Sequence, residues 1–170
     1  MSAIISPCGL YRFRLERDCG LPFEGSKVFA FFGVNPSTAD ANLDDATVRK
    51  WRGFTIRNGG VRFIVGNAFA YRATDVRALA NAPTDHDEAN WQHIKQIIAD
   101  ADILVPCWGN RSKVPKHKSF HFDLLTQVLF ESGKPVLHFG TTKSGDPKHP
   151  QMLGYDTPLV PWNGQPTLPS

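Results

Sequence analysis

A buried strand that ends abruptly in a long polar loop is the feature that most constrains the fold of this chain. Residues 28–32 are all apolar, and Gly, Val, Asn, Pro and Ser follow at 33–37. Pro36 lacks a backbone donor and moves Asn35 out of the α-helical region, so the strand has to stop there. The polar stretch continues to Asp45, whereas an ordinary strand-to-helix connection has about 2–6 residues. Because open α/β sheets bind ligands just past the carboxyl ends of their strands, we expect a binding loop here, with an ordinary connection as the alternative.

Short apolar runs alternate with helical patterns along the rest of the chain. The predicted strands cover residues 28–32, 61–69, 103–107 and 135–139. The predicted helices begin at Asp44 or Asp45, at Thr84 and at Phe120, and they end near Gly59, Ile98 and Glu131. This alternation predicts a three-layer α/β/α fold around a central, mainly parallel four-stranded sheet.

The segment before the central strand follows a different pattern. Residues 10–17 alternate apolar and basic side chains, which predicts a half-buried antiparallel strand in an N-terminal hairpin. The first seven residues carry no readable pattern. A chain of 170 residues is expected to form one α/β domain over 1–170, with its core over 10–155 and an irregular tail over 156–170.

Composition excludes several classes of protein. No window approaches 18 apolar residues and no signal-peptide pattern is present, so we expect a cytoplasmic protein without a membrane partner. The three cysteines have neither CxxC spacing nor an even count, which argues against a disulfide framework or a zinc site. The net charge of +3 is compatible with a phosphate-bearing ligand and does not by itself indicate nucleic acid. The common nucleotide and hydrolase signatures, from Walker A to G-x-S-x-G, are absent.

Polar and aromatic side chains follow each predicted strand. They are Gly33, Asn35, Pro36 and Ser37 after the first, Asn67, Phe69, Tyr71 and Arg72 after the second, Trp108 and Asn110 after the third, and Lys143 and His149 after the fourth. Because these strand ends meet at one edge of a parallel sheet, we expect the four segments to converge on one pocket.

The residues after the second strand offer the groups that a nucleobase needs. The amide of Asn67 supplies a fixed donor and acceptor for a base edge, and the alternative is an Asn that bonds loop backbone. Phe69 and Tyr71 either stack on a base or pack in the core. Arg72 holds either a phosphate or an acidic neighbour.

The other segments leave similar alternatives open. His149 precedes a proline in a loop rich in Gly and Lys, and it is either a ligand-binding group or a structural histidine. The basic residues at 111–118 suit phosphates, with a solvated loop as the alternative.

The longest motifs resemble a known family. GVNPSTADANLDDATVRKW at 33–51, GNAFAYRATDVRAL at 66–79, CWG at 107–109 and FGTTKSGDPKHPQML at 139–153 resemble the bacterial and phage family called domain of unknown function 1643. The resemblance runs from about Tyr11 to Leu153.

The same motifs are also similar, in the same order, to those of the uracil-DNA glycosylase superfamily. Residues 33–36 resemble its first motif, whose Asn positions the attacking water. Asn67 and Arg72 resemble the strand-end Asn that reads the base edge and the Arg that follows it. His149 resembles the His of the last motif, which steadies the departing base. The resemblance implies a uracil-DNA glycosylase-like fold. Ser37 and Gln151 stand where that superfamily has Gly and Ser.

Together these features predict a protein that recognises a nucleobase or nucleotide, in DNA or free, and hydrolyses an N-glycosidic bond. Asn35, aided by Asp40 or Asp45, would place water at the sugar carbon, and His149 would stabilise charge on the leaving base. No metal or organic cofactor is implied. The alternatives are a non-catalytic binder that sequesters a nucleotide, for instance in phage–host conflict, and a transferase that modifies a base. The oligomeric state is left open.

Overall fold

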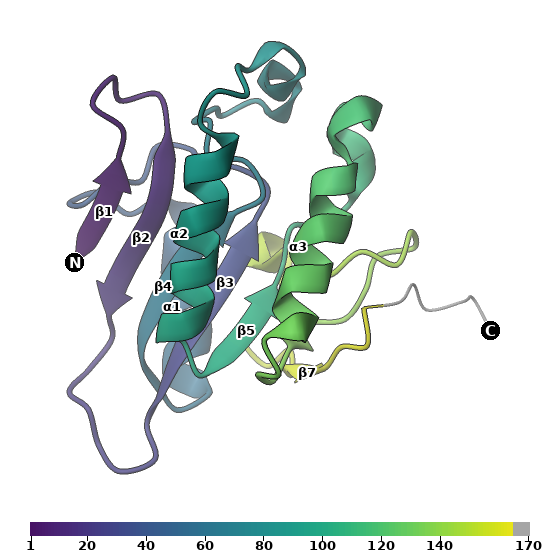
Figure 1. Cartoon of the computed structure of the whole chain (residues 1–170). Helices are drawn as coiled ribbons and strands as arrows, with labels where there is room; N and C mark the ends of the chain where they lie inside the picture. Colours follow the sequence, from purple (N-terminus) through teal and green to yellow (C-terminus); the bar gives the residue numbers. More distant parts are fainter. Residues whose placement is uncertain (165–170) are drawn as a thin grey trace.

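The sheet at the centre of the molecule is mixed and has five strands in the order β1-β2-β4-β3-β5 (Figure 1). The computed structural model describes residues 1–164. The strands are β1 (Ser2–Ile5), β2 (Arg12–Asp18), β3 (Lys27–Gly33), β4 (Gly60–Asn67) and β5 (Ile103–Pro106). β3 pairs in parallel with β4 and β5, whereas β2 pairs antiparallel with β1 and β4. The α/β class is therefore confirmed, but only the centre of the sheet is parallel.

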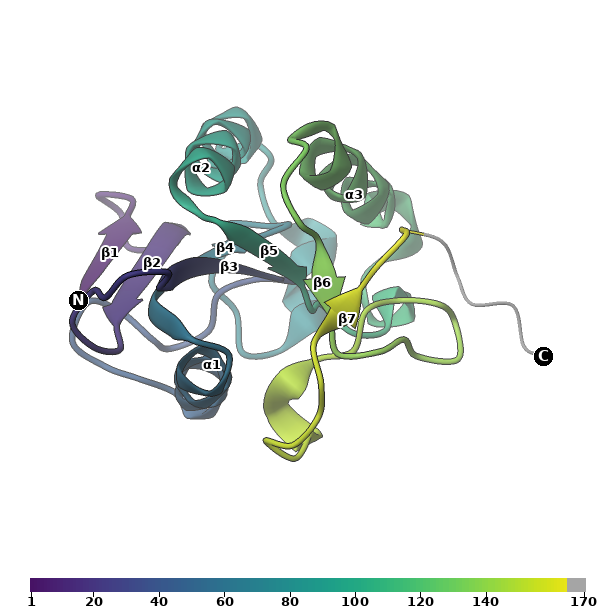
Figure 2. The same ribbon diagram turned by 90° about the horizontal axis from the view of Figure 1, so that it is seen from below.

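Helices cover both faces of this sheet (Figure 2). α1 (Ala46–Arg57) lies on one face, and α2 (Asp87–Asp100) and α3 (Phe120–Glu131) lie on the other. Short 3-10 helices in the connections are η1 (Val76–Asn81), η2 (Arg111–Lys113), η3 (Lys116–Lys118) and η4 (Pro150–Met152). None of the helices within residues 1–164 is long and apolar enough to cross a membrane.

Two hydrophobic clusters fill the space between the sheet and its helices. Strand β3 contributes to both, because Phe29 and Phe31 belong to the cluster beneath α1, and Ala30 and Phe32 to the cluster beneath α2 and α3. Successive side chains of a strand point to opposite faces, so a strand covered on both faces is apolar at every position. This is the physical reason for the continuous apolar run that precedes the polar loop after β3.

Helix α1 begins and ends as the sequence predicts. Asp45 is its N-cap, and Oδ1 of Asp45 accepts a hydrogen bond from the backbone N–H of Val48 at 3.0 Å. The carboxylate satisfies an otherwise unpaired amide and lies at the positive end of the helix. Gly59 follows the helix with a φ of +76°, which glycine adopts without steric cost. The sequence prediction that Asp44 or Asp45 caps this helix is confirmed, and the residue is Asp45.

The prediction of a fourth strand in the central sheet is wrong. Within residues 135–139 only β6 (Leu137–His138) is a strand, and it pairs antiparallel with β7 (Val160–Pro161) in a separate two-stranded sheet. An isolated parallel bridge from Leu104 to Val136 joins this segment to β5. The N–H of Leu104 also donates to the carbonyl of Pro135 at 3.0 Å, and the pairing with β5 goes no further. On the other edge of β6 the chain after residue 156 returns to pair with it and buries Trp162 in the core beneath α3. That part of the predicted tail is therefore ordered, and residues 165–170 lie outside the described chain.

The N-terminal region also departs from the prediction. Residues 2–5 form β1, although the sequence there shows no pattern. In β2 the arginines are buried and not solvent-facing, so the prediction of a half-buried strand is wrong. Arg14 lies between Glu16 and Asp100, with both ion pairs at 2.7 Å. The partners that allow these cations to be buried come from distant segments, which the local pattern of residues 10–17 does not contain.

Candidate functional site

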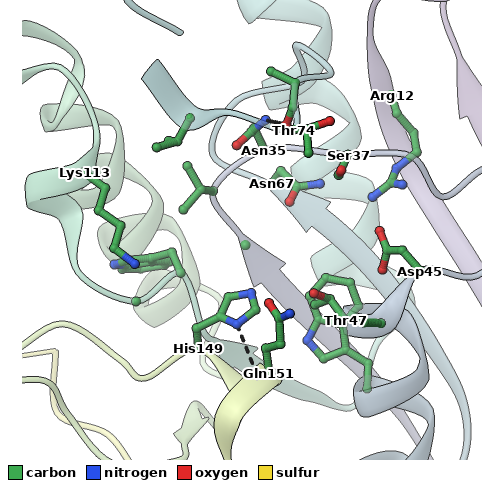
Figure 3. A pocket seen from close by; sticks show the side chains of 18 of the residues that line it. Arg12, Asn35, Ser37, Asp45, Thr47, Asn67, Thr74, Lys113, His149 and Gln151 are labelled. Carbon is green, nitrogen blue, oxygen red and sulfur yellow. Dashed lines mark hydrogen bonds between the residues drawn. The ribbon is translucent and has the colours of Figure 1, made fainter. Parts of the chain in front are cut away.

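A cavity of about 560 Å³ opens where β3, β4 and β5 end (Figure 3). Its walls come from the segments that follow these strands, from the first turn of α1, from η4 and from the start of β2. Of the predicted site residues, those that line it are Gly33, Asn35, Ser37, Asp45, Asn67, Trp108 and His149. The sequence prediction that the four segments converge is met for these residues.

Asn67 presents a free amide to this cavity. Only 3% of its surface is exposed, and its side chain forms no hydrogen bond within residues 1–164. Oδ1 of Asn67 lies above Gly33 on the adjacent strand, where an added Cβ would come within 2.9 Å of it. Glycine at position 33 therefore leaves the room that this amide occupies.

Asn35 has already used the donors of its amide. Its Nδ2 donates to the backbone carbonyls of Ala73 at 2.8 Å, Pro36 at 3.1 Å and Tyr71 at 3.4 Å. These bonds fasten the loop after β3 to the segment after β4. The side chain of Asn35 also lines the cavity, so what it can offer a ligand or a water is its carbonyl oxygen, an acceptor.

Of the two carboxylates considered for catalysis, the structure brings Asp45 into the cavity and leaves Asp40 outside it. The carboxylate of Asp40 accepts hydrogen bonds from the backbone N–H groups of Asn42 at 2.8 Å and Leu43 at 2.9 Å. These bonds lower the pKa of Asp40. Asp40 therefore shapes its own loop, while Asp45 combines its capping role with a place in the cavity wall.

A hydrogen bond to one ring nitrogen of His149 determines which of its two nitrogens can donate to a ligand. Nδ1 of His149 accepts a hydrogen bond from the backbone N–H of Gln151 at 3.2 Å, so the neutral ring carries its proton on Nε2. Burial, and then the nearby positive charge of Lys113, lower the pKa of His149 below its ordinary value of 6.5, against a smaller opposing effect of Asp45. At neutral pH the ring is an uncharged donor.

Arg12 is one of several cavity residues that the sequence prediction missed, with Thr47, Trp51 and Thr74 among the others. It reaches the cavity from β2 with 3% of its surface exposed. Nη1 of Arg12 donates to the carbonyl of Ala39 at 2.6 Å, but Nε has no hydrogen-bond partner. Burial lowers the pKa of Arg12 to about 10, partly offset by the negative charge of Asp45. The alternating pattern of residues 10–17 places the basic side chains in solvent, so no local signal pointed to this residue.

The remaining predicted residues lie outside the cavity lining. They are Pro36, Asp40, Phe69, Tyr71, Arg72, Asn110 and Lys143.

The contacts of Phe69, Arg72 and Asn110 explain why these side chains lie outside the cavity. Phe69 packs in the core with its ring centroid 4.8 Å from that of His121. Arg72 donates to the backbone carbonyls of Gly9, Ser37 and Thr38 at 3.2–3.4 Å. Asn110 accepts from the backbone N–H of Ser112.

A family model described as "Protein of unknown function (DUF1643)" matches residues 12–151. The chain belongs to the DUF1643 family. Both ends of the match, Arg12 and Gln151, are residues of the cavity wall, so the matched span encloses nearly all of the DUF1643 site. No curated protein and no solved structure matches the chain.

The DUF1643 cavity combines free donors, free acceptors and aromatic walls. Trp51 and Trp108 line it, and the indole N–H of Trp108 has no partner. Lys113, which the sequence places in the basic loop, stands on the side of the cavity away from Arg12 (Figure 3). No group of three or more His, Cys, Asp or Glu side chains in the described chain is arranged to hold a metal ion. The arrangement suits a planar polar ligand.

Proposed function

We propose that this DUF1643 protein binds a nucleobase or nucleotide in the cavity at the ends of β3, β4 and β5. The observation that carries the proposal is the amide of Asn67, which is buried at a strand end and has no hydrogen-bond partner. The amide faces the cavity, where a ligand whose edge supplies one acceptor and one donor would hydrogen-bond to both of its ends, and nucleobase edges have that pattern.

The aromatic walls support the same proposal. Trp51 and Trp108 take the stacking role that the sequence prediction gave to Phe69 or Tyr71. Base–aromatic stacking contributes about 1–3 kcal/mol per base. Lys113 at the rim is exposed and suits a phosphate attached to the base through a sugar.

A relation to the uracil-DNA glycosylase superfamily is part of this proposal. What supports it is that Asn35, Asn67 and His149, the residues that resemble that superfamily's motifs, line one cavity although they are far apart in the sequence. The segments after β3, β4 and β5 also lie next to one another at one end of the sheet, which such a relation would require.

The test compares two asparagines that are equally buried. Asn67→Ala should weaken binding of a nucleoside or nucleotide by about tenfold, since one hydrogen bond contributes about 0.5–1.5 kcal/mol, and should leave the free energy of unfolding nearly unchanged. Asn90 is also 3% exposed, but its Nδ2 donates to the backbone carbonyl of Asn67 at 3.0 Å. Asn90→Ala should therefore lower stability by about 1–3 kcal/mol.

Binding is measured by isothermal titration calorimetry with the ribo- and deoxyribonucleosides and their 5′-monophosphates, and stability by urea unfolding. The proposal fails if none of these compounds binds the wild-type protein, or if Asn67→Ala binds as tightly as the wild type.

Hydrolysis of an N-glycosidic bond is the second candidate function, favoured by the pair formed by Asn35 and His149. The carbonyl oxygen of Asn35 can orient a water toward the sugar carbon, and Nε2–H of His149 can donate to the departing base. Loss of one such donor costs about 10²–10³-fold in turnover, so His149→Gln should slow release of free base by that factor with little loss of affinity. Chromatography of nucleosides, nucleotides and single-stranded DNA after incubation measures the release. A non-catalytic binder would release no base from any of them.

A further inference from the structure

We propose that Arg12 and Asp45 together bind an uncharged donor–acceptor edge of the ligand, and that the phosphate lies elsewhere; this rests on the proposed function. Both side chains line the same wall of the cavity (Figure 3). The pair would act as a specificity-determining element that reads the amide- or amidine-type edge of the base.

Arg12 needs an acceptor that the protein does not supply. Its side chain is buried, and its single hydrogen bond in the described chain runs from Nη1 to the carbonyl of Ala39. Nε has no partner but is enclosed by protein, so the group that a ligand in the cavity would meet is Nη2, which has no hydrogen-bond partner within residues 1–164 either. Burying a cation without full hydrogen bonding is costly, and an acceptor on a ligand would offset that cost.

Asp45 has an oxygen to offer beside this cation. Oδ1 of Asp45 caps α1 by accepting from Val48, which leaves Oδ2 for another donor. Within residues 1–164 no ion pair of 4.0 Å or less joins Arg12 to Asp45, although both face the cavity. Because both side chains line the cavity and form no ion pair with each other, one ligand in the cavity can contact both.

A second buried arginine of β2 does form an ion pair with its neighbouring carboxylate. Arg17, also on β2, contacts the carboxylate of Asp44 directly, with Nε to Oδ1 at 2.6 Å. Asp44 and Asp45 are neighbours in the sequence. The carboxylate of Asp44 therefore forms an ion pair with one buried arginine of β2, whereas the carboxylate of Asp45 forms none with the other. The open arrangement at Arg12 is therefore specific to the cavity.

Charge decides what fits between the two groups. An anion would satisfy Arg12 but be repelled by Asp45, and a cation would meet the opposite difficulty. An uncharged edge with a C=O or ring nitrogen beside an N–H satisfies both, because the guanidinium donates to the acceptor and the carboxylate accepts from the donor. Lys113, across the cavity and exposed, is the better partner for a phosphate.

A substitution that neutralises Asp45 tests the proposal by the direction in which it changes affinity. Asp45→Asn keeps a good N-cap residue and removes the negative charge. If the pair reads an uncharged edge, Asp45→Asn and Arg12→Gln should each weaken binding about 10–100-fold, and equally for a nucleoside and its 5′-monophosphate. Calorimetric titration with the tightest-binding nucleoside and its monophosphate measures this, and circular dichroism confirms that each variant is folded. Should Arg12→Gln not fold, the sign of the Asp45→Asn effect decides alone.

Three results would overturn the proposal in different ways. If Asp45→Asn tightens binding of the monophosphate, or Arg12→Gln weakens only the monophosphate, an anion lies at Arg12. If Asp45→Asn leaves affinity unchanged and abolishes base release, Asp45 activates water and does not read the edge. If no nucleoside or nucleotide binds the wild-type protein, the proposed function fails and this inference fails with it, whereas the first two results leave nucleotide binding intact.

Discussion

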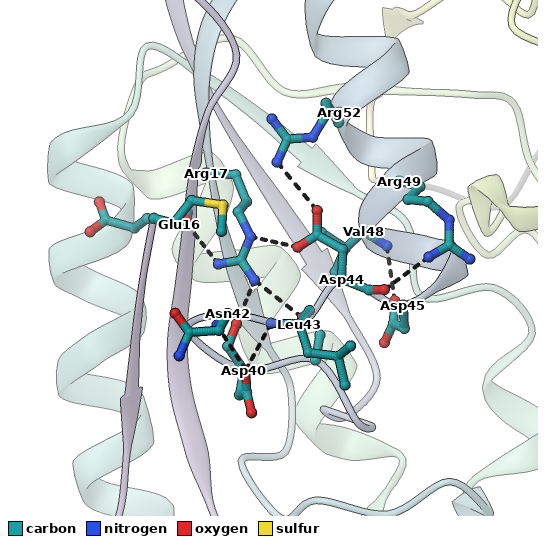
Figure 4. A network of polar contacts seen from close by, with 12 residues as sticks. Glu16, Arg17, Asp40, Asn42, Leu43, Asp44, Asp45, Val48, Arg49 and Arg52 are labelled. Carbon is teal, nitrogen blue, oxygen red and sulfur yellow. Dashed lines mark hydrogen bonds and ion pairs between the residues drawn. The ribbon is translucent and has the colours of Figure 1, made fainter.

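Two buried arginines of the same strand differ in how fully their hydrogen-bonding capacity is used. Arg17 has 0% of its surface exposed, and it contacts Asp44 and the backbone carbonyls of Asp40, Leu43 and Glu16 (Figure 4). Arg12 has a hydrogen bond to one carbonyl and an Nε without a partner. A saturated cation holds structure together, whereas an unsaturated one beside a cavity is available to a ligand.

The Arg17 network sets the position of the cavity wall. Burial alone would raise the pKa of Asp44, but the hydrogen bonds and charges of Arg17 and Arg52 lower it below its ordinary value of 3.8. Two of the carbonyls that Arg17 contacts, those of Asp40 and Leu43, belong to the loop between β3 and α1, and the same loop carries Asp45 into the cavity. The hydrogen bonds of Arg17 therefore fix the loop that places Asp45 beside Arg12, whose hydrogen-bonding capacity is not fully used.

The largest expected effect is a difference in the free energy of unfolding between substitutions at Arg17 and at Arg12. Arg17→Met should lower the free energy of unfolding by about 3–5 kcal/mol, because it leaves Asp44 and several carbonyls short of a partner. Arg12→Met should cost about 1 kcal/mol or less, since removal of an unsatisfied buried cation offsets the lost bond to Ala39.

Urea unfolding measures both changes. Arg77→Gln is the control, because Arg77 pairs with Asp75 in solvent with 86% of its side chain exposed, and an ion pair that solvent screens this fully contributes little to stability. Equal losses for Arg17→Met and Arg12→Met would contradict the comparison.

A smaller effect is expected where the cavity depends on one glycine. Gly33→Ala places a Cβ 2.9 Å from Oδ1 of Asn67 and should push that amide aside. We expect about a tenfold loss of nucleoside affinity with a change in stability below about 1 kcal/mol, because the displaced group is the end of a side chain. Gly20→Ala, where an added Cβ meets nothing within 4 Å, should change neither quantity. Unchanged affinity in Gly33→Ala would remove Asn67 from the binding site.

The pH dependence of stability should distinguish His149 from a solvated histidine. Its pKa is lowered in the folded state, so the unfolded chain binds a proton first as the pH falls below about 6.5. The neutral ring of His149 thus contributes fully to the free energy of unfolding above pH 6.5. This contribution is lost as the pH falls toward the lowered pKa of the folded state. His149→Gln should flatten the decline of unfolding free energy as the pH falls below 6.5. His117→Gln, at an exposed histidine, should leave that slope unchanged.

The smallest effect concerns the exposed cation at the rim. Lys113→Gln should weaken binding of a nucleoside 5′-monophosphate about twofold to fivefold and leave the nucleoside unaffected, since an exposed ion pair contributes about 0.2–1 kcal/mol. The difference should shrink at high salt. Lys116→Gln removes the same charge from the next 3-10 turn, outside the cavity lining, and should have no effect. Equal effects from both lysines would indicate only a diffuse attraction to the basic loop.

Several features followed from the sequence because their causes are local. The end of β3 at the Asn-Pro loop, the Asp45 cap of α1 and the glycine after that helix depend on backbone geometry within a few residues. The alternation of apolar runs and helical patterns predicted the α/β class for the same reason. Asn67 was also accessible to this reasoning, because a polar residue at the end of an apolar strand faces the edge where ligands bind.

Other features were decided only by the tertiary structure, because their causes lie far apart in the sequence. Residues 137–138 look like a strand of the main sheet, but their hydrogen-bond partner arrives from 160–161. The donors of Asn35 go to carbonyls up to 38 residues away, which no motif reveals. Arg12 has the local pattern of a solvated residue, yet it is buried once the loop after β3 folds over β2. A sequence pattern shows which side chains are polar, but only the assembled fold determines which of them are left without a partner.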